Sequence, residues 1–168
     1  MTSIILTTAR LQLRRMHAGD LDFLAEMLAD PEVMRHYPKV FNRQEAGDWL
    51  DKVFKRYEED GHAFWLVENR STGEPIGQCG LLAQQVNDAR EMEIGYMLHR
   101  RHWRQGYAHE AASGVRDWAI EELDASRLVS LIRPANIPSQ RVALSYGAKP
   151  EKLVVWRDLE HLVFSLHR

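Results

Sequence analysis

The alternation of hydrophobic and polar positions in the first sixty residues predicts one strand followed by helices. Apolar side chains alternate with polar ones over residues 11–16, which is typical of a half-buried strand. They recur at three- and four-residue spacing over residues 23–28, so we expect a helix there, capped by Asp20. A short helical turn is expected at residues 31–36, and a longer amphipathic helix at residues 42–57.

The rest of the chain predicts strands that alternate with helices. Two apolar runs, residues 62–68 and 75–82, flank the turn-forming residues 69–73 and predict a hairpin. Clean alternation over residues 90–98 predicts a strand with carboxylates on one face. The remaining expected elements are a helix after residue 108, a strand at 127–133, a short helix at 137–146 and an antiparallel pair at 152–157 and 161–167.

These elements predict one α/β domain, of the mixed α+β kind, over residues 1–168. A chain of 168 residues suits a single globular domain that buries about two thirds of its unfolded surface. We find no internal repeat, low-complexity tract or Pro/Gly/Ser linker that would divide it. The expected architecture is a mixed sheet flanked by helices.

Charge and composition exclude several kinds of partner. The formal net charge of -2 provides no global field for a polyanion, so nucleic acid is not an expected partner. No stretch reaches the about 18 apolar residues of a membrane span, and the apolar run near the N-terminus lacks the flanks of a signal peptide. Cys79 is the only cysteine, which favours a reducing, cytoplasmic location and a packing role for this thiol.

The segment over residues 93–112 carries the strongest chemical signal. A strand that enters a tight loop and then a helix leaves several backbone N–H groups pointing at one place, where the helix dipole adds positive charge. Gly106 allows a ligand to approach the backbone closely. Basic side chains surround it, namely Arg100, Arg101, His102 and Arg104. This pattern is typical of a phosphate site, but a plain connection with a solvated basic face explains it equally well.

The sequence Trp103-Arg-Gln-Gly106-Tyr-Ala108 resembles the pyrophosphate loop of the GNAT superfamily of N-acetyltransferases, usually written Q/R-x-x-G-x-G/A. Further motifs follow the order seen in the branch that acetylates ribosomal-protein N-termini. They are Arg10-Leu-Gln-Leu-Arg14, Asp30-Pro-Glu-Val33, Ile76-Gly77, Glu93-Ile-Gly-Tyr96 and Asn136-x-x-Ser139. The resemblance covers nearly the whole chain and implies a mostly antiparallel mixed sheet that is splayed at its central strands.

The resemblance also implies acetyl-CoA as cosubstrate, with no metal. Loop amides would bind the pyrophosphate, and the backbone of the strand before the loop would pair with the pantetheine arm, which Asn136 would also contact. The implied binding residues are Tyr96, Met97, Leu98, Trp103, Arg104, Gln105, Gly106, Tyr107, Ala108 and Asn136. Trp103 replaces the usual Gln or Arg and so removes a side-chain phosphate contact. We interpret His99, His102 and His109 as surface residues, because they have no carboxylate or thiolate partner in the pattern.

The resemblance further implies direct transfer, without an acyl-enzyme. Glu93 is the candidate base for the attacking amine, and its alternative role is a structural carboxylate paired with an arginine. The tyrosine that many GNAT enzymes use for the leaving thiolate is replaced by Ala143. Ser139 is therefore the candidate donor to the thiolate, with a helix cap as its alternative role, and Tyr146 is the reserve candidate.

The acceptor is implied only by the branch that the chain resembles, which favours a protein N-terminus. A small amine, such as an aminoglycoside, a polyamine or an amino-acid-like toxin, is the main alternative. A module that binds acyl-CoA without turning it over is a second alternative. Tyr37 could line an acceptor cleft, whereas we expect Trp65 in the core. Both a monomer and a homodimer are compatible with the sequence.

Overall fold

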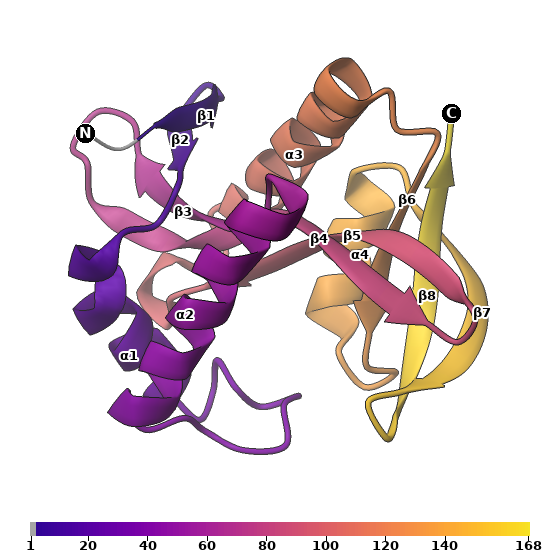
Figure 1. Cartoon of the computed structure of the whole chain (residues 1–168), viewed down its shortest axis with the longest axis horizontal. Helices are drawn as coiled ribbons and strands as arrows, with labels where there is room; N and C mark the ends of the chain where they lie inside the picture. Colours follow the sequence, from indigo (N-terminus) through magenta and orange to yellow (C-terminus); the bar gives the residue numbers. More distant parts are fainter. Residues whose placement is uncertain (1–2) are drawn as a thin grey trace.

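The computed structural model describes residues 3–168, which form one eight-stranded sheet with helices on both faces (Figure 1). The strands are β1 (Ile4–Thr7), β2 (Leu11–Arg14), β3 (Phe64–Asn69), β4 (Pro75–Val86), β5 (Ala89–Leu98), β6 (Arg127–Ile132), β7 (Lys149–Trp156) and β8 (Leu159–His167). The helices are α1 (Leu21–Ala29), α2 (Arg43–Asp60), α3 (Tyr107–Leu123) and α4 (Ile137–Ser145), with 3-10 turns η1 (Ala18–Asp20) and η2 (Arg100–His102). The strand order is β1-β2-β3-β4-β5-β6-β8-β7.

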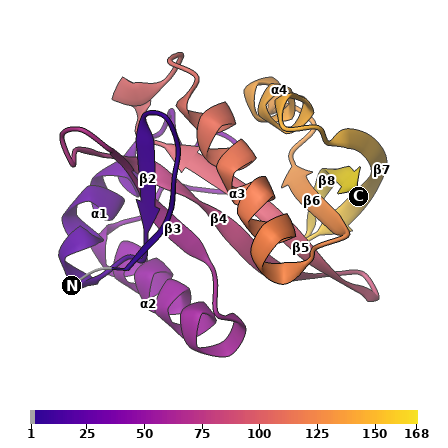
Figure 2. The same cartoon turned by 90° about the horizontal axis from the view of Figure 1, so that it is seen from above.

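Two aromatic contacts show how the helices cover the sheet. Trp49 of α2 stacks on Phe64 of β3, with ring centroids 5.9 Å apart. Trp118 of α3 meets the next residue of the same strand, Trp65, edge-on at 4.9 Å. Successive strand residues point to opposite faces, so α2 and α3 lie on opposite faces of the sheet (Figure 2). Trp65 and Cys79 are fully buried, which confirms their predicted packing roles.

The sheet opens between β5 and β6, as the resemblance implies. Every neighbouring pair of strands is antiparallel except β5 and β6, which are parallel and share one register position, Glu93 with Val129. Beyond it, β5 continues beside β4 while β6 continues beside β8. The predicted mixed sheet, splayed at its central strands, is therefore confirmed, and the splay divides the molecule visibly in Figure 1.

Helix α2 begins and ends at the signals that its sequence carries. Asn42 accepts a hydrogen bond from the Glu45 backbone N–H at 2.9 Å, and the Glu45 carboxylate accepts one from the Asn42 N–H at 3.1 Å. This reciprocal capping box satisfies two N–H groups that the first turn leaves free. The helix continues three residues beyond the predicted end and stops at Gly61, whose φ of 81° is left-handed.

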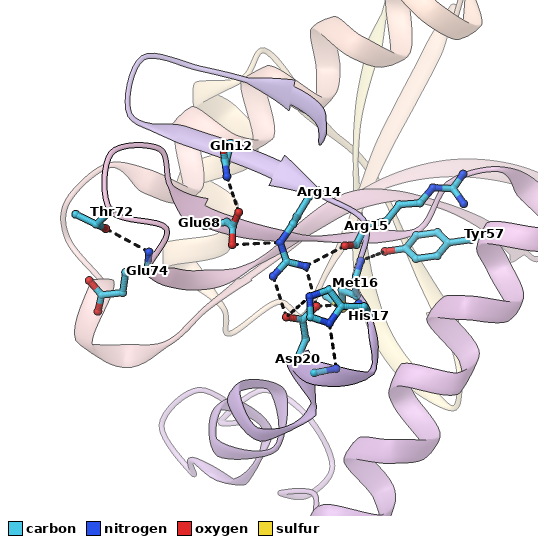
Figure 3. Close-up of polar contacts among 11 residues, drawn as sticks. Gln12, Arg14, Arg15, Met16, His17, Asp20, Tyr57, Glu68, Thr72 and Glu74 are labelled. Carbon is cyan, nitrogen blue, oxygen red and sulfur yellow. Dashed lines mark hydrogen bonds and ion pairs between the residues drawn. The ribbon is translucent and has the colours of Figure 1, made fainter. Parts of the chain in front are cut away.

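The prediction that Asp20 caps α1 is wrong. The Asp20 carboxylate accepts two hydrogen bonds of 2.9 Å from the Arg14 guanidinium and one of 2.8 Å from the His17 N–H (Figure 3). Arg14 is buried beneath the N-terminal strands and also pairs with Glu68 at 3.2 Å. A buried guanidinium needs ionised partners, so it takes the carboxylate that the pattern assigned to the helix.

Strand β1 was not predicted, because its sequence, Ile-Ile-Leu-Thr, is an apolar run without alternation. It pairs with β2 and forms the edge strand at that end of the sheet. The expected helical turn at residues 31–36 is present as hydrogen-bonded turns, in which the Met34 N–H donates to the Asp30 carbonyl at 3.0 Å. Over residues 3–168, no helix combines the length and the apolar character that crossing a bilayer requires.

Candidate active site

The edge of β5 that faces the splay exposes backbone groups of Tyr96 and Leu98. The His99 N–H donates to the Ile76 carbonyl at 2.9 Å, next to the register pair of Gly77 and Leu98. Since hydrogen-bonded and non-hydrogen-bonded pairs alternate in an antiparallel ladder, the N–H and C=O groups of Tyr96 and Leu98 point away from β4. Those of Met97 point towards β4. The predicted backbone pairing with a ligand is thereby restricted to Tyr96 and Leu98.

Side chains replace the missing ladder hydrogen bonds where the strands part. The Ser130 hydroxyl donates to the Ile94 carbonyl at 2.7 Å, and the Leu131 N–H donates to the Glu93 carboxylate at 3.2 Å. Tyr146 is 1% exposed, and its hydroxyl is hydrogen-bonded to Ser130 at 2.7 Å. These contacts hold the splay open at a fixed position. Tyr146, the reserve candidate for the donor to the thiolate, therefore makes a buried contact between these strands.

The loop between η2 and α3 has the backbone of an anion site. Arg104 and Gly106 adopt left-handed φ angles of 62° and 79°, and α3 begins after Gly106 without a side-chain cap. Within residues 3–168, the N–H groups of residues 104–109 donate to no protein acceptor. Free N–H groups at the positive end of a 17-residue helix favour a bound anion. Of the predicted residues, Trp103, Arg104, Gln105 and Gly106 form this turn, and Tyr107 and Ala108 are the first residues of α3.

The indole of Trp103 braces the loop. Its Nε1–H donates to the Leu98 carbonyl at 3.0 Å, so the loop is tied back to the end of β5. Trp103, which replaces the usual Gln or Arg of the motif, therefore makes a structural contact in place of a side-chain phosphate contact. This bond also occupies one of the outward-facing backbone acceptors of β5 and leaves the Leu98 N–H free for a ligand.

Arg10 is a further loop-binding residue, whose role the sequence did not reveal. Its guanidinium donates to the Gln105 carbonyl at 2.8 Å, lies 4.4 Å from the centre of the Tyr107 ring and pairs with Glu110 at 2.7 Å. Burial raises the pKa of Glu110, but hydrogen bonds from Thr8 and Arg10 outweigh it and lower the pKa overall. The motif that begins at Arg10 was visible in the sequence, but it did not indicate that Arg10 contacts residues about 100 positions further along the chain.

Glu93 is 9% exposed and faces the splay. Its two oxygens accept hydrogen bonds from a neutral amide, Gln84 at 3.0 Å, and from the Leu131 N–H, rather than from an arginine. Burial raises the pKa of this carboxyl, against the opposing effects of Gln84, Leu131, Arg157 and Arg56. A raised pKa makes Glu93 a stronger base than an exposed glutamate, as a role in proton transfer requires.

Glu93 and Tyr96 reach the splay from opposite faces of the sheet. Glu93 lies opposite Leu82 in the β4–β5 ladder, on the face that α2 covers, while Tyr96 lies opposite Cys79 on the face that α3 covers. The loop between α1 and α2 also lies on the α2 face, where the Tyr37 ring meets Trp49 edge-on with ring centroids 6.4 Å apart. The Glu93 carboxylate and the Tyr96 hydroxyl therefore lie on opposite faces of the sheet beside the splay.

Ser139 and Tyr96 form a pair of hydroxyl groups on the α3 face. The Ser139 hydroxyl donates to the Tyr96 oxygen at 3.2 Å, and the Tyr96 hydroxyl donates to the Ser139 carbonyl at 2.6 Å. Asn136 is the cap of α4, because its side-chain oxygen accepts from the Ser139 N–H at 3.2 Å. The alternative role of Ser139 as a side-chain cap is therefore wrong. The sequence assigned Tyr96 a backbone role only and missed its hydroxyl.

The prediction that the three histidines around the loop are surface residues without carboxylate partners is wrong for His99 and His102, which are buried and lie near glutamates. His99 lies 3.2 Å from Glu26, His102 lies 3.5 Å from Glu74, and His109 is hydrogen-bonded to Ser145 at 2.7 Å. In the part of the chain that the structure describes, no group of three potential metal ligands comes together.

Comparison with known proteins agrees with this geometry. Residues 10–149 match the family described as "Acetyltransferase (GNAT) domain". A Bacillus subtilis protein, YkkB, is 37% identical over 150 residues, which cover 89% of this chain and 87% of the relative. The crystal structure of an acetyltransferase from Agrobacterium tumefaciens superposes with a TM-score of 0.85 at 30% identity, covering 100% of this chain and 95% of the other.

A structure described as a putative ribosomal-protein-serine acetyltransferase from Vibrio cholerae superposes with a TM-score of 0.81 at 25% identity, covering 100% of this chain and 98% of the other. The chain belongs to the GNAT acetyltransferase family. It is an N-acetyltransferase, as its motifs predict.

Proposed function

We propose that the protein transfers the acetyl group of acetyl-CoA directly to the α-amine of a protein N-terminus, while both substrates are bound. The observation that carries this proposal is the placement of Glu93 and of the Ser139–Tyr96 pair on opposite faces of one opening. An amine that enters beside Glu93 meets a thioester that enters beside Ser139, which is the geometry that direct attack needs.

The free amides of residues 104–109 would hold the pyrophosphate of the donor. Backbone groups of Tyr96 and Leu98 would pair with the pantetheine arm, as a neighbouring strand does, and the Asn136 amide would contact it from α4. The Tyr96 and Leu98 backbone groups suit this role because they lie on the edge of β5 where no neighbouring strand pairs with them. The donor would therefore lie in the gap between β5 and β6.

In the chemical step, the amine nitrogen attacks the carbonyl carbon of the thioester. The C–N bond forms, the C–S bond breaks, and the electron pair of that bond leaves on sulfur. Glu93 accepts the amine proton, directly or through a water molecule. The Ser139 hydroxyl donates a hydrogen bond to the departing thiolate, which solvent then protonates.

The chemistry favours an α-amine over a lysine side chain. At neutral pH, deprotonation costs about 1 kcal/mol for an α-amine but about 5 kcal/mol for a lysine, whose pKa is near 10.4. A carboxylate is a weaker base than either amine, so Glu93 suits the acceptor that is easier to deprotonate. This argument supports an N-terminal amine and disfavours an internal lysine.

The test is release of free CoA thiol across a panel of amines. We expect turnover with peptides that have a free N-terminus, and none with the same peptides when the N-terminus is blocked but a lysine remains. Turnover confined to a polyamine, an aminoglycoside or a free amino acid would replace the proposed acceptor. Tight binding of acetyl-CoA without thiol release from any amine would establish a non-catalytic module.

A further inference from the structure

A surface groove lies near Glu93, on the α2 face of the sheet. It is a groove of about 440 Å³ between one side of α2, the end of β4 and the β7–β8 turn. Gln84 lies in its wall and donates to the Glu93 carboxylate at 3.0 Å. The groove is therefore one side chain away from the candidate base, on the side where the acceptor would enter.

The groove carries positive charge that its own acidic residues do not balance. Two of its basic side chains are paired, Lys55 with Glu59 at 3.7 Å and Arg90 with Asp60 at 3.0 Å. The other three have no carboxylate within 4.0 Å in residues 3–168: these are Lys52, Arg56 and Arg157. The net charge of the whole chain is -2, so this excess is local.

Arg56 and Arg157 converge on one uncharged acceptor. Arg56 donates to the Gln84 side-chain oxygen at 3.2 Å and to the Ala83 carbonyl at 2.7 Å, and Arg157 approaches the same Gln84 oxygen at 3.5 Å. Burial, and then the charge of Arg157, lower the pKa of Arg56. Two guanidinium groups that share one amide oxygen repel each other, and a carboxylate between them would relieve that repulsion.

Arg157 is held in this position by its turn. It adopts a left-handed φ of 52°, as does the following residue, Asp158, at 65°, and its guanidinium lies 4.3 Å from the centre of the Trp156 ring. The Trp156 indole in turn donates to the Gln85 carbonyl at 3.0 Å and so fixes the turn to β4. Two left-handed residues are usual in a two-residue hairpin turn, and here the turn and the Trp156 ring together hold the Arg157 guanidinium over the groove.

We propose that this groove binds an acidic segment of the acceptor, within the first few residues after the amine that is acetylated. Lys52 and Arg56 are one helical turn apart on α2, so their spacing of about 6 Å matches alternate residues of an extended peptide. The same charges disfavour aminoglycosides and polyamines as acceptors. This inference rests on the proposed function and names its substrate class.

The experiment compares three peptides that differ only at positions two to four, where they carry acidic residues, their amides, or lysines. With wild-type enzyme, kcat/KM for the acidic peptide exceeds that for the amide peptide on the order of tenfold, mostly through a lower KM. The lysine peptide is the poorest substrate. Raising the salt concentration from about 0.05 M to about 0.5 M narrows the difference, because exposed charges are screened.

The variants Arg56→Gln and Arg157→Gln should bring the ratio of kcat/KM for the acidic peptide to that for the amide peptide close to one. Each variant is compared with its own amide-peptide rate, because both arginines also act on Glu93 through Gln84. Arg43→Gln is the matched control, since Arg43 lies on the same helix, pairs with Asp22 outside the groove and changes the net charge equally. Arg157 is exposed, so its variant keeps the test valid if Arg56→Gln does not fold. Reversal of the preference by Arg157→Glu would add direct support.

Equal kcat/KM for the acidic and amide peptides, or faster acetylation of the lysine peptide, would overturn this inference and leave the proposed function standing. A small acidic amine that competes as well as the acidic peptide would also overturn it, because the groove would then recognise a single anionic group. Failure to acetylate any peptide, with acetyl-CoA still bound, would instead overturn the proposed function. The two failures are thus distinguishable.

Discussion

At the scale of single residues, Glu93 has both features expected of a base in a closed site. Burial raises the pKa of its carboxyl, while two hydrogen bonds from uncharged groups fix its orientation. A group that served only to balance an arginine would contact that arginine directly. Arg56 and Arg157 instead act on Glu93 from a distance, through Gln84.

The variant Glu93→Gln should leave acetyl-CoA affinity within about twofold and lower kcat on the order of a hundredfold. The wild-type rate should fall as pH drops through the raised pKa of Glu93, because the protonated carboxyl cannot accept a proton. This acidic limb should be absent from the variant. A pH profile of kcat for both proteins checks this, and an unchanged profile in the variant would assign Glu93 to structure alone.

Ser139→Ala should lower kcat about ten- to hundredfold, corresponding to about 1.5 to 3 kcal/mol for a hydrogen bond to a charged acceptor. Asn136, not Ser139, caps α4, so the melting temperature should change little. Ser145→Ala is the control, because this serine is on the same helix and its hydroxyl contacts the Val142 carbonyl and His109 rather than Tyr96. If both variants turn over at the wild-type rate, the thiolate has another donor.

At the scale of elements, the loop before α3 combines free amides with backbone strain. Gly106→Val should weaken acetyl-CoA binding strongly, because its left-handed φ of 79° excludes a branched residue without distortion of the loop. Gly61→Val is the matched control, since Gly61 has a φ of 81° and nothing within 4 Å of an added Cβ. Both variants should lose comparable folding stability, but only Gly106→Val should lose affinity in isothermal titration. Equal affinities would show that the loop does not hold the donor.

The first strands of the sheet position this loop through Arg10. Arg10→Ala removes the hydrogen bond to the Gln105 carbonyl and leaves Glu110 without its cation, so acetyl-CoA should bind on the order of tenfold more weakly. Arg70→Ala is the control, because Arg70 donates to the Thr8 carbonyl in the same region without touching the loop. Titration of both variants with acetyl-CoA decides the matter, and equal affinities would contradict a positioning role for Arg10.

At the scale of the whole molecule, local patterns predicted most of the elements but not the contacts between them. Alternation and helical spacing depend on residues close in sequence, so β5, β6 and α2 were predicted nearly at their observed bounds, whereas β4 extends to Val86, beyond its predicted end at residue 82. The splay was implied only by the family resemblance. Its local cause is a set of side chains, among them Ser130 and Glu93, that replace ladder hydrogen bonds between strands distant in sequence.

The incorrect predictions share a physical origin. Asp20 pairs with buried Arg14 instead of capping a helix, Asn136 takes the cap that was considered for Ser139, and Arg10 binds a loop 95 residues away. In each case a polar group had several possible partners, and tertiary packing selected one. The donor-binding role of the loop residues stays a prediction, and Gly106 was its local signal, because an amide site depends on backbone conformation.

In the proposed mechanism the two substrates meet at the splay from opposite faces of the sheet, so the acetyl group should pass between them without resting on the protein. Cys79, the only cysteine, is fully buried, and burial raises the pKa of its thiol, so it is not available to carry the acetyl group. Initial rates measured over a grid of acetyl-CoA and acceptor-peptide concentrations test this most directly. The proposed mechanism predicts intersecting double-reciprocal lines, whereas parallel lines together with an acetylated enzyme formed from acetyl-CoA alone would contradict it.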